Sequence, residues 1–180
     1  INFRTVFSNV QGSAEAISLT QHASERFFQR PDNHYKSVDS SRTSLTGTGG
    51  TLSFGKQSGS WIWELGSTYR SPELSLNDAG FLAQTDAWVQ WVFTQYRVLQ
   101  PVGIFRFMRM NLIQWREYDF GGSNLSSGYE LFYGTQFQNY WRLNTQFTLE
   151  GPQTSNADLR GGPSIRYPGG ANWWYWVGTN

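Results

Sequence analysis

Hydrophobic and polar residues alternate almost strictly between Ser127 and Leu149. The odd positions carry large apolar or aromatic side chains: Tyr129, Leu131, Tyr133, Phe137, Trp141, Leu143, Phe147 and Leu149. The even positions carry Gly128, Glu130, Gly134, Gln136, Gln138, Arg142, Asn144, Gln146 and Thr148. A period of two places alternate side chains on opposite faces of a strand, so this segment predicts β-structure with one apolar and one polar face.

The polar face of this segment is rich in Gly, Gln, Asn and Thr. A soluble β-sandwich would normally carry Lys and Glu on its polar face, whereas the lumen of a membrane barrel accepts small and uncharged polar residues. The pattern therefore predicts that the apolar face contacts lipid and that the polar face lines a wet lumen.

Nine segments have the alternation and the flanking turn residues of strands, at 1–10, 14–22, 45–56, 60–70, 85–99, 104–118, 125–138, 139–150 and 172–177. Several reach the roughly 9 to 11 residues that a tilted membrane strand needs. We therefore expect an all-β fold, an antiparallel transmembrane β-barrel, as a single domain over residues 1–180.

Two features favour part of a larger barrel. About nine strands is an odd number, whereas bacterial barrels usually have an even count. The chain also opens inside an expected strand with no signal peptide, so we expect an upstream region that includes one.

The connections between the expected strands differ in length. Residues 24–43 and 151–167 are long and polar, which is typical of extracellular barrel loops, and we expect residues 71–84 to fold back on the barrel. Within the strands, Ala87, Val89, Trp91 and Phe93 predict an outward odd face. Outward Met108, Met110 and Leu112 leave Arg106 and Arg116 on the lipid side unless they lie near an interface or a bulge.

Composition supports a folded membrane barrel. The chain is 38% hydrophobic and 15% charged, which excludes a disordered chain, and its 17% aromatic content exceeds what a soluble core needs. Aromatic girdles at two membrane interfaces account for the surplus. A soluble, aromatic-rich carbohydrate-binding β-sandwich is the alternative.

Charge and cysteine content exclude several function classes. A net charge of +1 without a basic stripe gives no basis for nucleic-acid binding. The absence of Cys removes disulfides, thiolate metal sites and cysteine nucleophiles, and no apolar run approaches the roughly 20 residues of a membrane-spanning helix.

Four sequence runs together resemble a known family: RSPELSLNDAGF at 70–81, WREYDFGG at 115–122, QFQNYW at 136–141 and LRGGPSIRYPGGANWW at 159–174. The stretch from about Phe27 to the end is similar to the C-terminal region of domain-of-unknown-function family 5916, from Bacteroidota and related Gram-negative bacteria. The resemblance implies an outer-membrane-type barrel that follows a family-9-like carbohydrate-binding domain. It brings no reaction, cofactor or catalytic residue.

Charged residues on the expected lumenal face are candidates for contact with a solute: Glu64, Glu130, Arg142 and Arg109. For Glu130 and Arg142 we favour a cross-strand ion pair that rigidifies the interior over contact with a solute. We expect the aromatic residues Trp141, Trp173, Trp174 and Trp176 at the membrane interface, with a sugar-stacking platform as the second use of the C-terminal cluster.

Loop residues offer few chemical sites. Arg160, Asn77 and Asp78 are binding candidates, although turn formation is the more frequent use of such Asx and Arg-Gly-Gly sequences than calcium or anion binding. The two histidines, His22 and His34, lack metal-ligand spacing. We expect no metal, no cofactor and no catalytic residue; an outer-membrane hydrolase that uses Asp32, His34, Asp39 and Ser40 is the less favoured alternative.

These patterns together predict a Gram-negative outer-membrane β-barrel protein that serves as a channel, a transporter or a scaffold component of a surface complex. Its expected partners are outer-membrane lipid, a glycan or other solute, and outer-membrane proteins, but no nucleic acid.

Overall fold

The computed structural model describes residues 1–77 and 82–179. Its elements in chain order are β1 (Asn2–Gln11), α1 (Ala14–Gln21), β2 (Ser44–Lys56), β3 (Trp61–Arg70), β4 (Ala87–Val98), β5 (Phe105–Tyr118), β6 (Asn124–Phe137), β7 (Arg142–Glu150), β8 (Gln153–Ser155), β9 (Ile165–Tyr167) and β10 (Gly170–Gly178).

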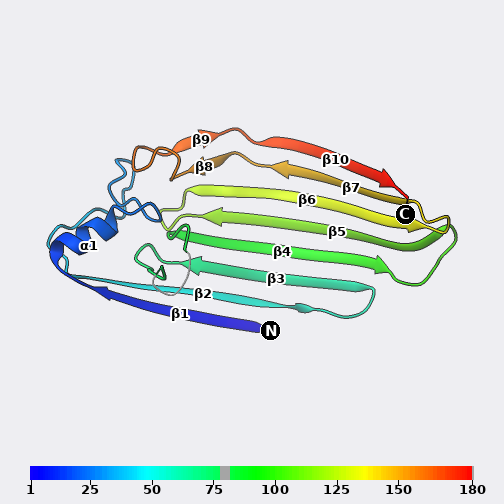
Figure 1. The fold of residues 1–180 in the computed structure, drawn as a ribbon, viewed down its shortest axis with the longest axis horizontal. Helices are drawn as coiled ribbons and strands as arrows, with labels where there is room; N and C mark the ends of the chain where they lie inside the picture. Colours follow the sequence, from blue (N-terminus) through cyan, green and yellow to red (C-terminus); the bar gives the residue numbers. More distant parts are fainter. Residues whose placement is uncertain (78–81, 180) are drawn as a thin grey trace.

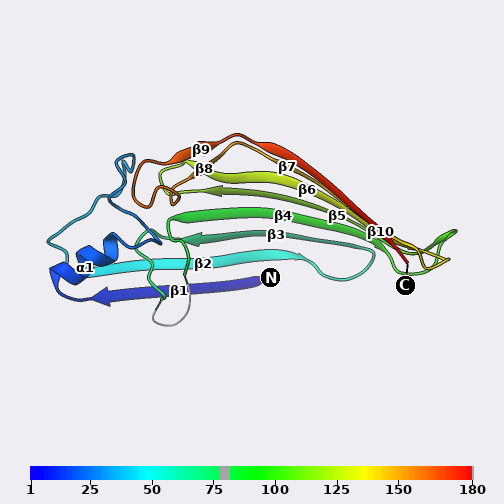
Figure 2. The same cartoon turned by 45° about the horizontal axis from the view of Figure 1, so that its top comes forward.

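Eight of these strands form one antiparallel sheet in the order β1-β2-β3-β4-β5-β6-β7-β10 (Figure 1). The strands bow along their length (Figure 2), and β8 and β9 form a separate hairpin between β7 and β10. The prediction of an antiparallel all-β fold is confirmed, but the expected nine-strand count is wrong for this sheet. The sheet is open, since β1 and β10 are its two edges among the described strands.

Residues 14–21 form the helix α1 in the segment 14–22, where a strand was expected. Ser13 is the N-cap, and its hydroxyl accepts a hydrogen bond from Ala16 N at 3.2 Å. Glu15 lies in the first turn, where a carboxylate interacts favourably with the helix dipole. Ile17 and Gln21, four residues apart, are the buried positions of the helix. Within the described part of the chain, no helix has the length and apolar character needed to cross a membrane.

The turn between β6 and β7 contains no glycine, and it occupies residues that were expected to begin a strand. Tyr140 adopts a φ of 69°, a left-handed conformation that is uncommon for a residue with a Cβ. Tyr140 N donates to Phe137 O at 3.0 Å, and Asn139 Oδ1 accepts from Trp141 N at 3.3 Å. The second strand of this hairpin therefore begins only at Arg142.

The sheet has two distinct faces, which we name by two neighbouring residues of β6. The inner face carries Glu130, and the outer face carries Leu131. The register connects each face across the sheet: one inner row runs Gly55, Glu64, Phe93, Ile113, Glu130, Thr148 and Asn172. The adjacent outer row runs Lys56, Trp63, Thr94, Leu112, Leu131, Phe147 and Trp173.

The outer face consists mainly of apolar and aromatic side chains that no other described element covers. Its exposed members include Phe3, Phe7, Leu52, Phe54, Trp61, Tyr96, Leu112, Tyr129, Leu131, Phe147, Leu149, Trp173 and Tyr175. A monomeric soluble protein rarely exposes so extensive an apolar surface. The predicted separation of apolar and polar faces in residues 127–149 is confirmed.

The inner face of β4 is opposite to the one expected. Ala87, Val89, Trp91 and Phe93 share the inner face with Glu64 and Glu130, whereas Trp88, Val92 and Tyr96 are exposed on the outer face. The prediction was wrong because β4 carries aromatic and β-branched residues on both faces, so alternation alone does not identify the apolar side.

Two inner-face tryptophans pack against glycines of neighbouring strands. Trp91 covers Gly66, where an added Cβ would lie 2.1 Å from Trp91 Cζ2. Trp115 covers Gly128, where an added Cβ would lie 2.5 Å from Trp115 Cζ2. Glycine at these two positions therefore lets a broad indole ring approach the strand backbone.

The buried apolar residues gather at one end of the sheet, which we call the loop end; the short turns 57–60, 99–104 and 138–141 form the opposite, turn end (Figure 1). Ile17, Phe28 and Leu45 form the hydrophobic core cluster there. We call α1 together with residues 22–43, 71–77, 82–86, 119–123 and 151–169 the loop-end cap.

Residues 71–77 fold back onto the sheet, as predicted for this connection. The backbone of Leu74 lies so close to Gly47 that an added Cβ would be 2.2 Å from Leu74 N. Ser75 N donates to Ser8 Oγ at 3.0 Å. Gly47 and Ser8 face the inner side, so the cap covers the inner face of β1 and β2 at the loop end.

Candidate functional site

A polar groove on the inner face of β5, β6, β7 and β10 is the main candidate site. It encloses about 620 Å³ and is lined by Trp115, Glu130, Gln146, Thr148, Glu150, Gly170, Ala171, Asn172 and Trp174. Its surface combines two carboxylates, amide and hydroxyl groups, and two indole rings. Such a surface can bind a polar solute by hydrogen bonds and can stack against the apolar face of a sugar ring.

Strand register explains why these side chains lie together. Glu130 is paired with Thr148, and Thr148 with Asn172, so the three residues form one row across β6, β7 and β10. Gln146 and Trp174 form the next row toward the turn end. Side chains in adjacent rows of one face lie within contact distance of one another.

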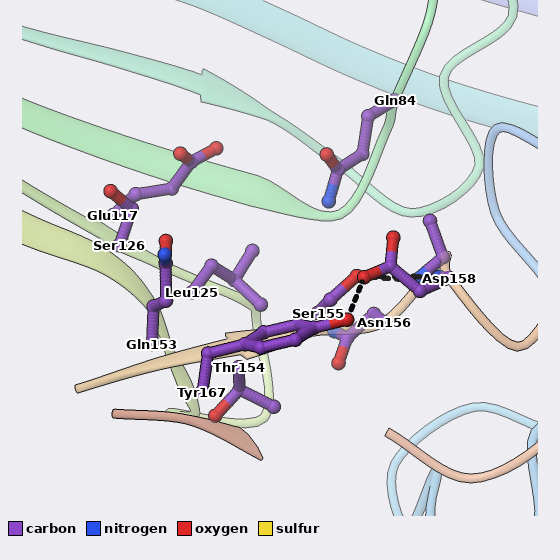
Figure 3. A pocket seen from close by; sticks show the side chains of 11 residues that line it. Gln84, Glu117, Leu125, Ser126, Gln153, Thr154, Ser155, Asn156, Asp158 and Tyr167 are labelled. Carbon is purple, nitrogen blue, oxygen red and sulfur yellow. Dashed lines mark hydrogen bonds between the residues drawn. The ribbon is translucent and has the colours of Figure 1, made fainter. Parts of the chain in front are cut away.

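A second hollow, of about 330 Å³, lies at the loop end of the same face (Figure 3). Glu117 and Ser126 line it from the sheet, while Gln84, Gln153 and Asp158 line it from the cap. Because Glu117 is two residues from Trp115 on β5, the hollow continues the polar groove toward the cap.

The cap side of this hollow carries a fixed phenol–carboxylate pair. Tyr167 Oη donates to Asp158 Oδ2 at 2.6 Å, and Asp158 N donates to Ser155 Oγ at 3.3 Å (Figure 3). The hydrogen bond from Tyr167 lowers the pKa of the Asp158 carboxyl, and it raises the pKa of the Tyr167 hydroxyl. Asp158 therefore remains a carboxylate at neutral pH and holds the aromatic ring in place.

A buried polar network joins four connections of the cap. Arg30 Nη2 lies 3.8 Å from Asp86 Oδ2, and Arg30 Nη1 donates to Ser164 Oγ at 3.3 Å. Tyr35 Oη donates to the same Asp86 carboxylate, whose other oxygen accepts from Phe120 N at 3.0 Å. These contacts join residues 22–43, 82–86, 119–123 and 151–169 through one buried network.

The charge state of Asp86 reflects its burial. Desolvation raises the pKa of the Asp86 carboxyl and outweighs the opposite effects of the Tyr35 hydrogen bond, the Phe120 hydrogen bond and the Arg30 charge. Burial also raises the pKa of the Tyr35 hydroxyl, and the contact with Asp86 adds to this rise. The phenol therefore stays protonated and acts as the donor.

The four predicted lumenal charges all lie on the inner face, but they do not meet. Glu64, on β3, accepts a hydrogen bond at Oε2 from Nε2 of Gln57 in the preceding turn, at 3.0 Å. The guanidinium of Arg109 lies 4.9 Å from the ring centroid of Phe132. Of the four, only Glu130 lines the polar groove.

The expected Glu130–Arg142 contact is wrong. Glu130 is paired with Thr148, whereas Arg142 is paired with Gln136. The two rows lie six positions apart along β6, which corresponds to roughly 20 Å along the strand. With a turn near Asn139, we expected Glu130 and Arg142 to lie at similar distances from the end of the hairpin. The observed register instead places Arg142 next to the turn and Glu130 far from it.

The four aromatic residues expected at the membrane interface divide between surfaces. Trp173 lies on the outer face, and Trp141 is exposed in the turn before β7. Trp174 and Trp176 lie on the inner face, because they pair with Gln146 and Asn144. The interface prediction therefore stands as a prediction only for Trp141 and Trp173.

The loop candidates are engaged in turns and cap contacts. Asn77 Nδ2 donates to Glu25 Oε1 at 2.9 Å, and Asn77 Oδ1 accepts from Leu82 N at 2.8 Å. Arg160 has a φ of 48° and donates its N–H to Ala157 O at 2.9 Å. Asp78 lies outside the described residues. In residues 1–77 and 82–179, no group of three or more His, Cys, Asp and Glu side chains is placed to hold a metal ion.

The polar groove includes residues that alternation did not single out as site residues. Trp115, Glu150 and Asn172 line it from three different strands. Trp115 occupies an odd position on β5, as Arg109 and Asn111 do. Because these two residues were expected to face inward, the same parity could have predicted that Trp115 does so too. Glu150 ends a strand and Asn172 lies on β10, so their proximity to Glu130 depends on long-range pairing.

Comparison with known proteins gives one family match. Residues 5–180 match the family model described as "Domain of unknown function (DUF5916)". No curated protein and no solved structure matches the chain. Because the matched region covers nearly the whole chain, this protein belongs to the DUF5916 family.

Proposed function

We propose that this chain forms part of the wall of a β-barrel in the outer membrane of a Gram-negative bacterium. The outer face contacts lipid, and the inner face lines a water-filled passage for a polar solute. The role is transport, or scaffolding within a surface complex, rather than catalysis.

The distribution of carboxylates is the observation that carries this proposal. The strands of the open sheet contain four acidic residues, Glu64, Glu117, Glu130 and Glu150, and all four face inward. Arg4, Arg70, Arg97, Arg109 and Arg142 also lie on the inner face. A charge is costly on a lipid-facing strand surface and tolerated in a wet lumen, so this distribution of carboxylates supports a membrane barrel.

Hydrogen bonding on the outer face supports contact with lipid. Three outer-face tryptophans donate their indole N–H groups to hydroxyls of neighbouring strands: Trp61 to Thr94 at 2.7 Å, Trp88 to Ser67 at 2.7 Å, and Trp173 to Thr145 at 2.8 Å. In water these groups would need no protein partner. In hydrocarbon an unsatisfied donor is expensive, so internal pairing favours a membrane environment.

The open edges are consistent with a larger barrel. Seven successive antiparallel pairings connect the eight strands, so β1 and β10 run antiparallel to each other. Closure therefore requires direct pairing of these edges or an even number of further strands between them. Either arrangement agrees with the even strand counts of bacterial barrels.

The test is membrane fractionation of the full-length protein, followed by gel migration with and without heating in detergent. Recovery in the outer membrane with a heat-dependent shift in mobility supports a closed barrel. A protein that remains soluble without detergent overturns the proposal, because the exposed outer face would then have to be buried by protein.

A conductance measurement tests whether the inner face lines a passage. In planar bilayers we expect Glu130→Gln to lower cation preference, because one carboxylate is removed from the polar groove. Glu15→Gln in α1 removes an exposed carboxylate outside the groove and is the matched control. Equal ion selectivity in both variants and the wild type would exclude a conducting role for this groove and leave the scaffold role.

Glycan binding is a second candidate function for the same groove. Trp115 and Trp174 border it together with the amides of Gln146 and Asn172, which are suitable donors and acceptors for sugar hydroxyls. Titration with oligosaccharides should quench tryptophan fluorescence in the wild type and much less in Trp174→Ala. No saturable response in the wild type would rule out this candidate.

A further inference from the structure

Arg116 is a cation on the outer face whose surroundings the proposed function leaves unexplained. It is exposed on β5, two residues before the loop end of the strand. Its register partners are Gln90 on β4 and Ser127 on β6. The only other outer-face cation within the described strands is Lys56, the last residue of β2, because Arg106 lies in the irregularity between Phe105 and Phe107.

Two phenols accompany the Arg116 guanidinium. Tyr118 and Tyr129 share the outer face with Arg116, and all three residues line the same hollow. A guanidinium donates hydrogen bonds through its N–H groups, and each phenol hydroxyl can donate one more. The three side chains together offer several donors to a single ligand.

A hollow of about 470 Å³ lies beside these residues. Arg116, Tyr118, Asn124, Ser127 and Tyr129 line its polar side, and Leu149 lines its apolar side. Glu150 also borders the hollow, but the register directs its side chain to the inner face. Since no carboxylate of the described strands faces outward, the Arg116 charge has no acidic partner on its own surface.

The position of Arg116 agrees with the level of lipid headgroups. Tyr69, Trp88 and Tyr118 form one aromatic row across β3, β4 and β5, just beyond Arg116 toward the loop end. Such aromatic rows mark the boundary between hydrocarbon and headgroups. Toward the turn end from Arg116, the outer face carries the exposed side chains of Leu112, Leu131 and Leu149, which we call the apolar belt.

We propose that Arg116, with Tyr118 and Tyr129, binds the phosphate of an anionic membrane lipid at the loop-end boundary of the outer face. Arginine forms charge-assisted hydrogen bonds with phosphate oxygens, and the apolar belt accommodates the acyl chains. This inference rests on the proposed function, because it requires the outer face to contact the membrane.

The experiment titrates detergent-solubilised full-length protein with short-chain phosphatidic acid and counts bound lipids by native mass spectrometry. Arg116→Gln should weaken the tightest binding event about tenfold, as expected for the loss of one charge-assisted contact. Arg4→Gln removes an exposed arginine from the inner face and is the control, which should bind as the wild type does. Equal affinity in Arg116→Gln and the wild type would overturn the headgroup site.

Two further measurements separate the possible failures. Quenching of tryptophan fluorescence by brominated acyl chains in phosphatidylcholine vesicles reports lipid contact independently of Arg116. If quenching is absent, both the proposed function and the headgroup site are overturned; if it is present, only the binding comparison decides the site. Inorganic phosphate that competes as well as the lipid does would point to a free anion and overturn the lipid assignment.

Discussion

The sheet and the loop-end cap are stabilised in different ways. The sheet is held by strand pairing, and its large apolar side chains remain exposed on the outer face. The cap buries its apolar side chains around Ile17, Phe28 and Leu45 and connects its polar groups through Arg30 and Asp86. The cap therefore buries its apolar side chains as a water-soluble fold does, whereas the outer face of the sheet exposes the apolar side chains that we propose to contact lipid.

The largest effect is expected from breaking the buried network of the cap. Arg30→Ala leaves the Asp86 carboxylate buried without its cation, so we expect the free energy of cap opening to fall by about 3–5 kcal/mol. Hydrogen exchange of cap amides measures this change. Arg160→Ala, at an exposed cap position, should have no effect. Unchanged exchange in Arg30→Ala would contradict a unified cap.

A charge introduced in the middle of the outer face tests whether this face of the sheet contacts lipid. Leu131→Arg should lower the free energy of unfolding in phosphatidylcholine vesicles by about 2–4 kcal/mol, the typical cost of a cation at the bilayer midplane. Glu130→Arg places the same charge on the inner face of the same strand and should cost much less. Urea titration measures both variants, and equal costs would refute different environments for the two faces.

The N-cap of α1 provides a smaller and local test. Ser13→Ala removes the acceptor for Ala16 N and should destabilise the helix by about 1 kcal/mol. Faster hydrogen exchange in α1, with unchanged exchange in β4 and β5, is the expected result. Ser18→Ala, inside the same helix, should not accelerate exchange, since alanine has the higher helix propensity.

The smallest effect concerns pH. Folding raises the pKa of Asp86, so its contribution to stability is fully present below the unfolded pKa and is lost as pH rises through the folded pKa. The stability of the wild type relative to Asp86→Asn should therefore decrease as pH rises above about 4, the pKa of an unfolded Asp side chain.

Asp39 gives the opposite sign and serves as the control for this measurement. Hydrogen bonds from Ser41 lower the pKa of Asp39, so its contribution is present above the unfolded pKa and is lost as pH falls. Relative to Asp39→Asn, the wild type should gain stability as pH rises. Hydrogen exchange corrected for intrinsic rates distinguishes the two slopes, and slopes of the same sign would contradict one of the two assignments.

Sequence patterns predicted the sheet well because strand alternation is a local signal. The faces of residues 127–149 follow directly from their parity, and the expected strand at 104–118 differs by one residue from the observed Phe105–Tyr118. The helix at Ala14–Gln21 was missed, although Ser13 before Ala-Glu-Ala is a recognisable N-terminal signal.

The cap and the polar groove depend on contacts that no local pattern contains. Arg30 and Ser164 are hydrogen-bonded across 134 positions of the chain. Glu130 was identified from its parity, but its row partner Asn172 required the β7–β10 pairing. The wrong face prediction for β4 has a similar origin. Trp91 faces inward, where it packs over Gly66 of the neighbouring strand β3, and this contact is not visible in the local sequence of β4.

The pairing of Gly66 with Trp91 and of Gly128 with Trp115 determines how far the two indole rings project above the inner face of the sheet. The four residues belong to one row, with the two tryptophans adjacent in the middle and a glycine on either side. Each indole ring lies over its glycine instead of projecting away from the sheet. A methyl group at Gly66 or Gly128 would displace the adjacent indole ring and narrow the space above this row, so that space depends on two positions that have no side chain.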